Sequence, residues 1–414
     1  MLTKISIQEL RLGMHVHALE GSWLDHPFWK TRFLLREPAE LRQLVESGVT
    51  ECWIDVALGC DVAPKAAPSA CQPAAIQTPA PAPPAPILTT SAAPATTTMA
   101  EELNQAAAIC RRGRAAVVSM FQEARMGGAI NAQACLPLVE EITQSVLRNP
   151  GALVSLARLK TKDDYSYMHS VAVCALMIAL GRQLGLDDDE CRAAGMAGLL
   201  HDIGKAGVPL EILNKPSKLS SDEFAVVRTH PERGHALLLE GQGVGAQALD
   251  VCLHHHERID GKGYPFGLAG EAISRLARMG AVCDVYDAIT SNRPYKVGWN
   301  PAESIAQMAS WKGHFDPVIF SAFVRSLGIY PTGSLVRLQS GKLAVVVEQN
   351  PQSLTAPIIK AFYSTLAKMP ITPVLIDLAK QSYERIVARE AFSDWGFANL
   401  DELWLPADIL QRSH

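Results

Sequence analysis

The sequence predicts a mainly α-helical protein: a helical bundle with a small C-terminal β appendage, preceded by a small α+β domain and an Ala/Pro-rich linker. Three observations along the 414 residues predict this organisation. Apolar residues recur at three- and four-residue steps over most of the chain after position 100, which is the period of an α-helix. Before position 60 and after position 330 the step shortens to two residues, as in β-strands. A segment of different composition separates the first 60 residues from the helical part.

Residues 1–60 are expected to form the small α+β domain. A helix is predicted over residues 38–48, because Pro38 stands near its start and Gly48 follows its end. The predicted strands cover residues 4–7, 15–19, 32–35 and 51–55. We expect a regulatory or interaction role for this domain.

Residues 61–100 are predicted to be a linker. Ala and Pro supply 21 of the 38 residues from Val62 to Met99, and nine of these are proline. Prolines favour extended polyproline II, and the segment has too few large apolar side chains to offset the entropy lost on ordering. We therefore expect a semi-rigid tether between the small domain and the bundle.

Roughly nine helices are predicted between residues 101 and 330, with Gly and Pro between them. The periodic runs cover residues 101–126, 132–148, 164–184, 188–204, 220–240, 245–257, 271–290, 301–311 and 316–327. Residues 331–414 then predict the β-containing appendage. Runs at 334–338 and 342–347 around the turn at Ser340-Gly341 predict a hairpin, and residues 355–376 add further strand-like runs.

Composition excludes several classes of protein. Hydrophobic residues make up 48% and charged residues 19%, an ordinary balance for a globular chain. A net charge of −4 and a pI of about 6.3 argue against binding to a nucleic-acid polymer or a polybasic contact with a membrane. The nine cysteines show no CxxC spacing, and the longest apolar run, 171–180, is about half a membrane span. We expect a cytoplasmic protein with no membrane span.

Histidine and aspartate gather in the predicted bundle. The pieces are His169, His201-Asp202, His230, His254 to Glu257, and Asp284 with Asp287. Imidazole and carboxylate together suit divalent transition metals, and two such ions can activate a bridging hydroxide and hold phosphate oxygens. Each piece alone is more often a surface, loop or packing feature. Burying five imidazoles and two carboxylates without a metal would be costly, so the set as a whole predicts a metal site.

A second group of residues follows these histidines. Residues 260–268 form a Gly-rich turn, which by itself indicates only a loop. Its position places Tyr264 at the mouth of the expected metal pocket, where the ring offers a stacking face and a hydroxyl. Arg293 and Lys296 come after the last helix that carries candidate ligands. They can bind phosphate oxygens, or they can simply complement the dipole of a solvated helix end.

These residues resemble the signature of a known family. His201-Asp202 with Gly204-Lys205, followed by Gly263-Tyr264-Pro265, is similar to the HD-GYP family, a branch of the HD metal-dependent phosphohydrolases. The resemblance spans about residues 153–325, and residues 1–60, especially 21–28, look like the small domain often found before it. It implies a metal-dependent phosphodiesterase that hydrolyses cyclic di-GMP to pGpG and onward to GMP, through a hydroxide that bridges two divalent ions, iron or manganese.

The resemblance also implies roles for individual residues. The implied metal ligands are His169, His201, Asp202, His230, His255, His256 and Asp284, with Asp202 bridging the two ions. Lys205 would contact the scissile phosphate, and Asp287 would orient the hydroxide or protonate the leaving ribose oxygen. Tyr264, Arg293 and Lys296 would hold the guanine and phosphate groups of the substrate. Asp202, Lys205 and Asp287 are thus the expected catalytic residues.

One departure from the family pattern concerns the number of metal ions. Some members carry Glu four residues before the first His ligand, where it helps to hold a third ion; here that position is Tyr165. We therefore expect two metal ions and a slower second step, from pGpG to GMP.

Two other functions compete with this interpretation. The first is a cyclic di-GMP sensor, or a module that docks a partner such as a diguanylate cyclase, with little turnover; the intact set of ligands argues against it. The second is a general HD phosphohydrolase acting on mononucleotides or alarmones. The loop around Tyr264 and the pair Arg293 and Lys296 argue against that function.

Overall fold

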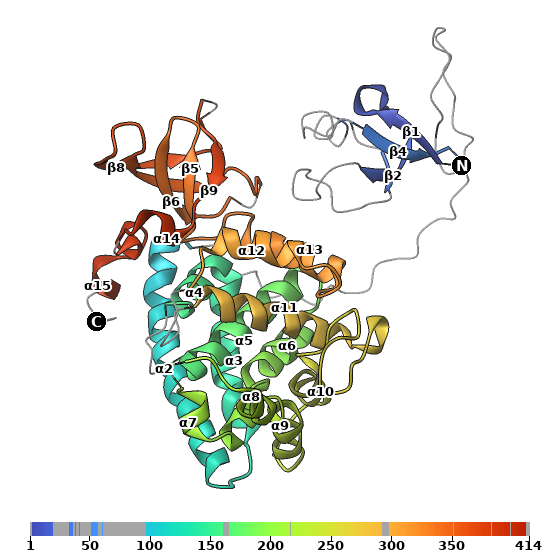
Figure 1. Ribbon diagram of the computed structural model, residues 1–414, viewed down its shortest axis with the longest axis vertical. Helices are drawn as coiled ribbons and strands as arrows, with labels where there is room; N and C mark the ends of the chain where they lie inside the picture. The colour runs from blue at the N-terminus through green and yellow to red at the C-terminus, as the bar shows by residue number, and fades with distance from the viewer. Residues whose placement is uncertain are drawn as a thin grey trace, which may run out of the picture. The chain divides into compact units, whose positions relative to one another are not determined.

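The computed structural model describes two compact units, residues 1–92 and 93–414, each of which is considered separately (Figure 1). The described residues are 2–19, 33–35, 38, 41, 51–56, 60, 97–159, 165–215, 217–291, 298–350, 352–381, 383–397 and 399–410. Apart from two isolated positions, the predicted helix over 38–48 lies outside them. The linker up to residue 96 also lies outside the described residues, and the predicted domain boundaries stay a prediction.

The N-terminal unit contains a four-stranded antiparallel sheet with strand order β1-β4-β2-β3. Its strands are β1 (Leu2–Ser6), β2 (His15–Leu19), β3 (Phe33–Leu34) and β4 (Glu51–Asp55). They lie where the two-residue alternation predicts strands. Val16 and Ile54 are fully buried in a small core together with Met14 and Leu35. This core is separate from that of the C-terminal unit.

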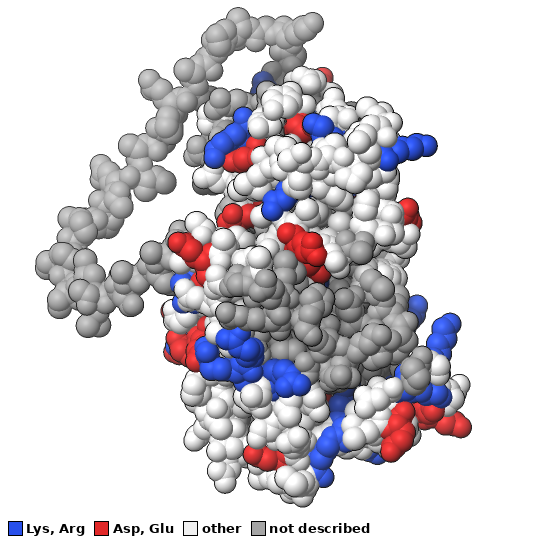
Figure 2. Space-filling view, turned by 90° about the vertical axis from the view of Figure 1, so that its left-hand side faces the viewer, with Lys and Arg blue, Asp and Glu red and all other residues white. Residues whose placement is uncertain are grey.

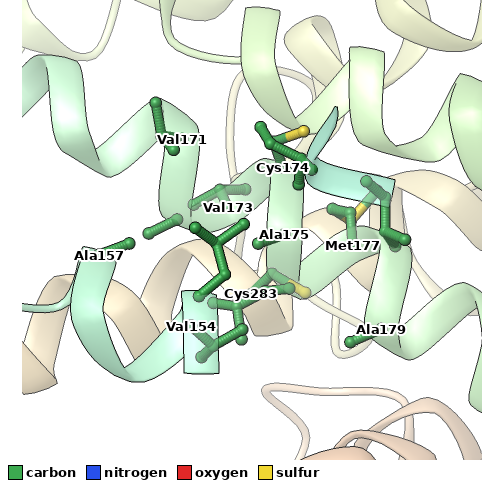
Figure 3. Packing of buried hydrophobic residues seen from close by; sticks show 14 of the residues in the cluster. Val154, Ala157, Val171, Val173, Cys174, Ala175, Met177, Ala179 and Cys283 are labelled. Carbon is green, nitrogen blue, oxygen red and sulfur yellow. The ribbon is translucent and has the colours of Figure 1, made fainter. Parts of the chain in front are cut away.

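The C-terminal unit is a helical bundle built around α5 (Tyr165–Gln183) (Figure 1). A helix that is apolar on all sides is stable only when it is surrounded by protein, and every residue from Met168 to Gly181 is buried. Figure 3 shows α5 side chains such as Val171, Cys174 and Met177 packed near Val154 and Cys283 from two other helices. The central position of α5 gives the bundle one core and fixes the direction of His169.

The helices around α5 follow the three- and four-residue pattern of the sequence. Those before α5 are α2 (Met99–Arg125), α3 (Leu136–Arg148) and α4 (Pro150–Ala157), with a 3-10 turn η2 (Ala132–Cys135). Those after it are α6 (Asp188–Leu200), α7 (Leu210–Leu213), α8 (Ser221–Val227), α9 (His230–Leu239), α10 (Ala246–His254), α11 (Arg275–Thr290), α12 (Pro301–Ser310) and α13 (Pro317–Leu327). Two further 3-10 turns are η3 (Ile203–Gly207) and η4 (Gly270–Ala272).

The predicted helices differ from the observed ones in several places. The single helix expected over 220–240 is two helices, because Pro231 has no N–H to bond the carbonyl of Val227 and its ring clashes with that carbonyl. The helix expected over 188–204 ends at Leu200 and continues as η3. The short helices α4 and α7 were not predicted; α4 is buried almost all round and therefore shows no amphipathic period.

A five-stranded antiparallel sheet follows the bundle, with strand order β8-β7-β6-β5-β9. Its strands are β5 (Leu335–Leu338), β6 (Lys342–Glu348), β7 (Ile358–Ser364), β8 (Met369–Asp377) and β9 (Ile386–Arg389), of which β9 was not predicted. Leu335, Leu343 and Val345 join the bundle core, whereas Val336 and Val346 on the opposite face belong to a core of the sheet's own. Because successive side chains in a strand point to opposite faces, one face of the sheet packs on the bundle.

Three short helical segments end the described chain: α14 (Phe392–Trp395), η5 (Leu400–Leu403) and α15 (Ala407–Leu410). Among the described helices, none has the length and apolar character needed to cross a bilayer. Figure 2 shows a group of Lys and Arg side chains on one face, with Asp and Glu scattered over the same face. Arg111, Arg112 and Arg114 on α2 are exposed, as expected for a solvated helix face.

Candidate metal centre

The bundle brings all seven predicted ligands together in one buried cluster. They come from five places: His169 on α5, His201 and Asp202 at the end of α6, His230 at the start of α9, His255 and His256 directly after α10, and Asp284 on α11. Their candidate donor atoms form two groups, His169 with His201 and Asp202, and His230 with His255 and His256. In each group the donor atoms lie within 4.8 Å of one another. Two neighbouring groups of this kind suit two metal ions.

Asp202 lies between the two groups. Its Oδ1 is 3.2 Å from Nε2 of His230 and 3.8 Å from Nε2 of His255. Its Oδ2 is 3.5 Å from Nε2 of His169 and 3.4 Å from Nε2 of His201. Each carboxylate oxygen therefore faces one pair of imidazoles, which is the arrangement that a bridging carboxylate requires.

Asp284 is the second carboxylate of the cluster. Its Oδ1 is 3.0 Å from Nε2 of His169, and its Oδ2 is 3.7 Å from Nδ1 of His256. It therefore also contacts a histidine from each group.

Contacts on the side that faces away from the cluster fix the ring orientation of four histidines. Nδ1 of each ring lies within hydrogen-bond distance of an oxygen outside the cluster, so that Nε2 faces the cluster. The pairs are His201 with Gly198 O (2.7 Å), His230 with Val227 O (2.7 Å), His255 with Val251 O (3.0 Å) and His169 with Asp287 Oδ2 (2.6 Å). The carbonyl of Val227 is available because Pro231 cannot bond to it. The break between α8 and α9 therefore also orients His230.

The donor set fits divalent metal ions. His201 and Asp202 are 1% and 2% exposed, and Nε2 of His201 and Oδ1 of Asp202 have no hydrogen-bond partner among the described residues. Buried polar atoms without a partner cost free energy, which bound metal ions would recover. Burial lowers the pKa of His201 and His255, which keeps the imidazoles neutral. Neutral imidazole and ionised carboxylate are the forms that bind metal.

Lys205 sits beside the cluster on η3. Its Nζ is 2.5 Å from Oδ2 of Asp202. Burial by itself raises the pKa of Asp202, but the positive charge of Lys205, together with the neighbouring imidazoles, outweighs burial and holds that pKa well below its usual value. The close approach of η3 to α9 needs a glycine, because a Cβ on Gly204 would lie 1.9 Å from the carbonyl oxygen of His230. Gly204 thus lets η3, which carries Lys205, pack closely against α9, which begins with His230.

Tyr264 lies next to the cluster, as its place after the histidines predicts. Its ring stacks on His256 with ring centroids 4.6 Å apart, and the guanidinium of Arg228 lies 4.6 Å from the same ring centroid. Gly263 allows this turn, because a Cβ there would lie 2.4 Å from the backbone N of Arg258. Nothing in the sequence pattern indicated Arg228, whose contact with Tyr264 joins residues 36 positions apart. A cavity of about 290 Å³ is lined by Tyr264, His256 and neighbouring residues.

Two of the predicted substrate-binding residues, Arg293 and Lys296, lie outside the described residues. The backbone of Tyr165 begins α5, and its side chain is likewise outside them. Asp287 is 2% exposed and contacts His169 from behind, and Ser291 Oγ donates to its other carboxylate oxygen at 3.2 Å. This position suits a residue that positions His169, and the expected role as proton donor or hydroxide-orienting residue stays a prediction.

Glu257 is a site residue that the sequence reasoning missed. Its side chain is buried, and its two carboxylate oxygens accept the backbone N–H groups of Phe266 at 2.7 Å and Leu268 at 3.0 Å. These two bonds hold the loop that carries Tyr264 against the end of α10. The signal in the sequence was an acidic residue directly after His255-His256.

Replacing Glu257 by glutamine is expected to lower the free energy of unfolding by about 1–3 kcal/mol, because an amide NH₂ would face a backbone donor and leave it unsatisfied. Urea unfolding of Glu257→Gln beside the wild type measures this change. Glu271→Gln is the control, because Glu271 is exposed on η4. Equal stability of Glu257→Gln and the wild type would contradict the role assigned to these two bonds.

Comparison with known proteins places the whole chain among related enzymes. Residues 2–135 match the family model of a domain of unknown function (DUF3391), and residues 146–319 match that of the HD domain. The chain is 57% identical over 406 residues to a cyclic di-GMP phosphodiesterase of Pseudomonas aeruginosa, an alignment that covers 98% of this chain and 96% of that protein.

Two further matches are shorter. The chain is 45% identical over 180 residues to the cyclic di-GMP phosphodiesterase response regulator RpfG of Xanthomonas campestris, covering 41% of this chain and 47% of that protein. It is 36% identical over 169 residues to 3'3'-cGAMP-specific phosphodiesterase 1 of Vibrio cholerae, covering 40% and 38% of the two chains.

Proposed function

Because the chain belongs to the HD-GYP family of HD-domain phosphodiesterases, we propose that it hydrolyses cyclic di-GMP to pGpG, and pGpG more slowly to GMP, at the cluster around Asp202. The observation that carries this proposal is the place of the Asp202 carboxylate, with one oxygen toward each of two histidine groups and Lys205 beside it. The name of the Pseudomonas aeruginosa relative, which is similar over nearly the whole chain, supports cyclic di-GMP as the substrate.

The residues that would hold the metal ions are the seven of the cluster. We assign His169, His201 and Asp202 to one ion and His230, His255 and His256 to the other, with Asp202 shared between them and Asp284 beside both groups. When bound, two divalent ions, iron or manganese, supply Lewis acidity that generates hydroxide from water near neutral pH and neutralises charge on the phosphate. The imidazole-rich donor set with two carboxylates supports this choice of metal.

The chain's own residues have separate tasks at this site. Lys205 places a positive charge next to the scissile phosphate of the substrate. Through its contact with Asp202 it also keeps that carboxylate ionised. Asp287 holds His169 in the orientation that directs Nε2 at the cluster. Tyr264 already stacks on His256, so its hydroxyl is the group that we assign to the substrate. We assign phosphate and guanine binding to Arg293 and Lys296 from the family resemblance.

A product time course tests the proposed function. Purified protein, loaded anaerobically with Fe(II) or with Mn(II), is given cyclic di-GMP or 3'3'-cGAMP, and the products are separated by chromatography. We expect cyclic di-GMP to be consumed, pGpG to accumulate before GMP, and metal analysis to find two ions per chain. Faster turnover of 3'3'-cGAMP would reassign the substrate to that of the Vibrio cholerae relative. Binding of cyclic di-GMP without turnover under either metal would make the protein a sensor.

A further inference from the structure

A second cavity, of about 470 Å³, lies in the C-terminal unit apart from the metal cluster. Its walls come from the first residues of α2, the length of α4, the end of α13 and the end of β6. A volume of this order is typical of pockets that bind small organic molecules. None of the seven cluster residues lines it, so it is a separate site.

Arg158 supplies a buried positive charge on the wall of this cavity. The residue is 7% exposed, and within the described part of the chain it forms one hydrogen bond, from Nη2 to the carbonyl oxygen of Thr332 at 3.3 Å. A guanidinium carries five N–H donors, so most of its capacity is unused. No described carboxylate lies within ion-pair distance of it. A buried cation of this kind is stabilised by an anionic partner.

Thr332 provides an uncommitted hydroxyl next to this guanidinium. The residue is 3% exposed, and its Oγ1 has no hydrogen-bond partner among the described residues. Oγ1 lies beside the first turn of α4, since a Cβ built on Gly151 would be 3.8 Å from it. The same cavity exposes apolar surface from Met99, Val154 and Leu327. A cation and a free hydroxyl therefore adjoin an apolar wall.

The other charges on the wall restrict the ligand to a single negative charge. Arg148 also lines the cavity, but it is already bonded to Glu102 at 2.7 and 2.9 Å. Glu348 stands on the same wall and would repel a dianion such as phosphate. We propose that this cavity binds a small carboxylate with an apolar body, whose carboxylate pairs with Arg158 and accepts a hydrogen bond from Thr332.

The cavity also touches the helix that supplies a metal ligand. Tyr286 lines the cavity from α11, between Asp284 in the cluster and Asp287 behind His169. A carboxylate bound there contacts α11 directly and is expected to change turnover at the metal centre. This effect on turnover rests on the proposed function, whereas binding to the cavity does not.

Binding of octanoate to the full-length protein tests the site, with octan-1-ol and inorganic phosphate as matched probes. Isothermal titration calorimetry and thermal unfolding measure affinity and the rise of Tm with ligand concentration. We expect octanoate to bind at one site per chain and to raise Tm, octan-1-ol to do neither, and phosphate not to compete with octanoate. Absence of octanoate binding, or equal binding of octan-1-ol, would overturn the proposal.

Two variants assign the binding to this cavity. Thr332→Val removes a hydroxyl that has no hydrogen-bond partner in the described part of the chain and keeps the side-chain volume, so the fold should persist while octanoate binding weakens about tenfold or more. Ser304→Ala is the matched control, because Ser304 Oγ on α12 is also buried without a partner among the described residues and does not line the cavity. Arg158→Gln is expected to abolish binding. Unchanged affinity in Thr332→Val would contradict the assignment, even where Arg158→Gln fails to fold.

Discussion

Replacing Asp202 by alanine is expected to lower hydrolysis of cyclic di-GMP by more than about 1000-fold, a change of about 4 kcal/mol in activation free energy. The carboxylate faces both histidine groups, since its two oxygens lie 3.2 Å from His230 and 3.4 Å from His201. Without it Asp284 still contacts one histidine of each group, but the carboxylate that lies between the two groups is lost, and Lys205 loses its carboxylate partner. Steady-state kinetics and metal analysis of Asp202→Ala measure the loss of turnover and of bound metal.

A matched variant separates loss of the bridge from loss of an Asp–His pair elsewhere in the bundle. Asp250 is 2.9 Å from Nδ1 of His254 on α10, outside the cluster. Asp250→Asn is expected to keep two metal ions and most of the activity. Turnover of Asp202→Ala within tenfold of the wild type would contradict the mechanism in which Asp202 is shared by the two histidine groups.

Asp287→Asn is expected to reduce kcat by about 10–100-fold with little change in KM, through weaker metal binding at His169. A carboxylate only accepts hydrogen bonds, so Asp287 keeps the proton of His169 on Nδ1 and leaves the lone pair of Nε2 toward the cluster. An amide can also donate, which permits the other tautomer and places a proton on Nε2. Titration of metal-free protein with Mn(II), followed by kinetics, measures both effects.

Ser291→Ala gives a graded comparison for this positioning role. Ser291 Oγ donates to the other oxygen of Asp287, so removing it weakens the support without changing the tautomer. We expect a smaller decrease in the same direction, and recovery of Asp287→Asn at high metal concentration. An Asp287→Asn enzyme with full metal content and a large loss of kcat would instead support a direct part in proton transfer.

The sequence alone located the residues that the structure brings together in the cluster, because their chemistry is contained in short segments. His201-Asp202 and His255-His256 are neighbours in the chain, and imidazole beside carboxylate has a narrow range of uses when buried. The helical period located α5 and α11, which carry His169 and Asp284, and the alternation located the strands of both sheets except β9. The periods of helices and strands follow from backbone geometry, so the spacing of apolar residues in the sequence indicates them directly.

Tertiary structure decided which partners these donors have, because packing joins residues that the chain keeps far apart. Asp287 and His169 are 118 residues apart in sequence, yet they form the bond that orients the imidazole. Arg228, directly after the end of α8, lies against the ring of Tyr264, which is 36 residues away in sequence. Arg158 and Thr332 meet across 174 residues. No periodic pattern records such contacts, since they arise when helices dock and bury their side chains against one another.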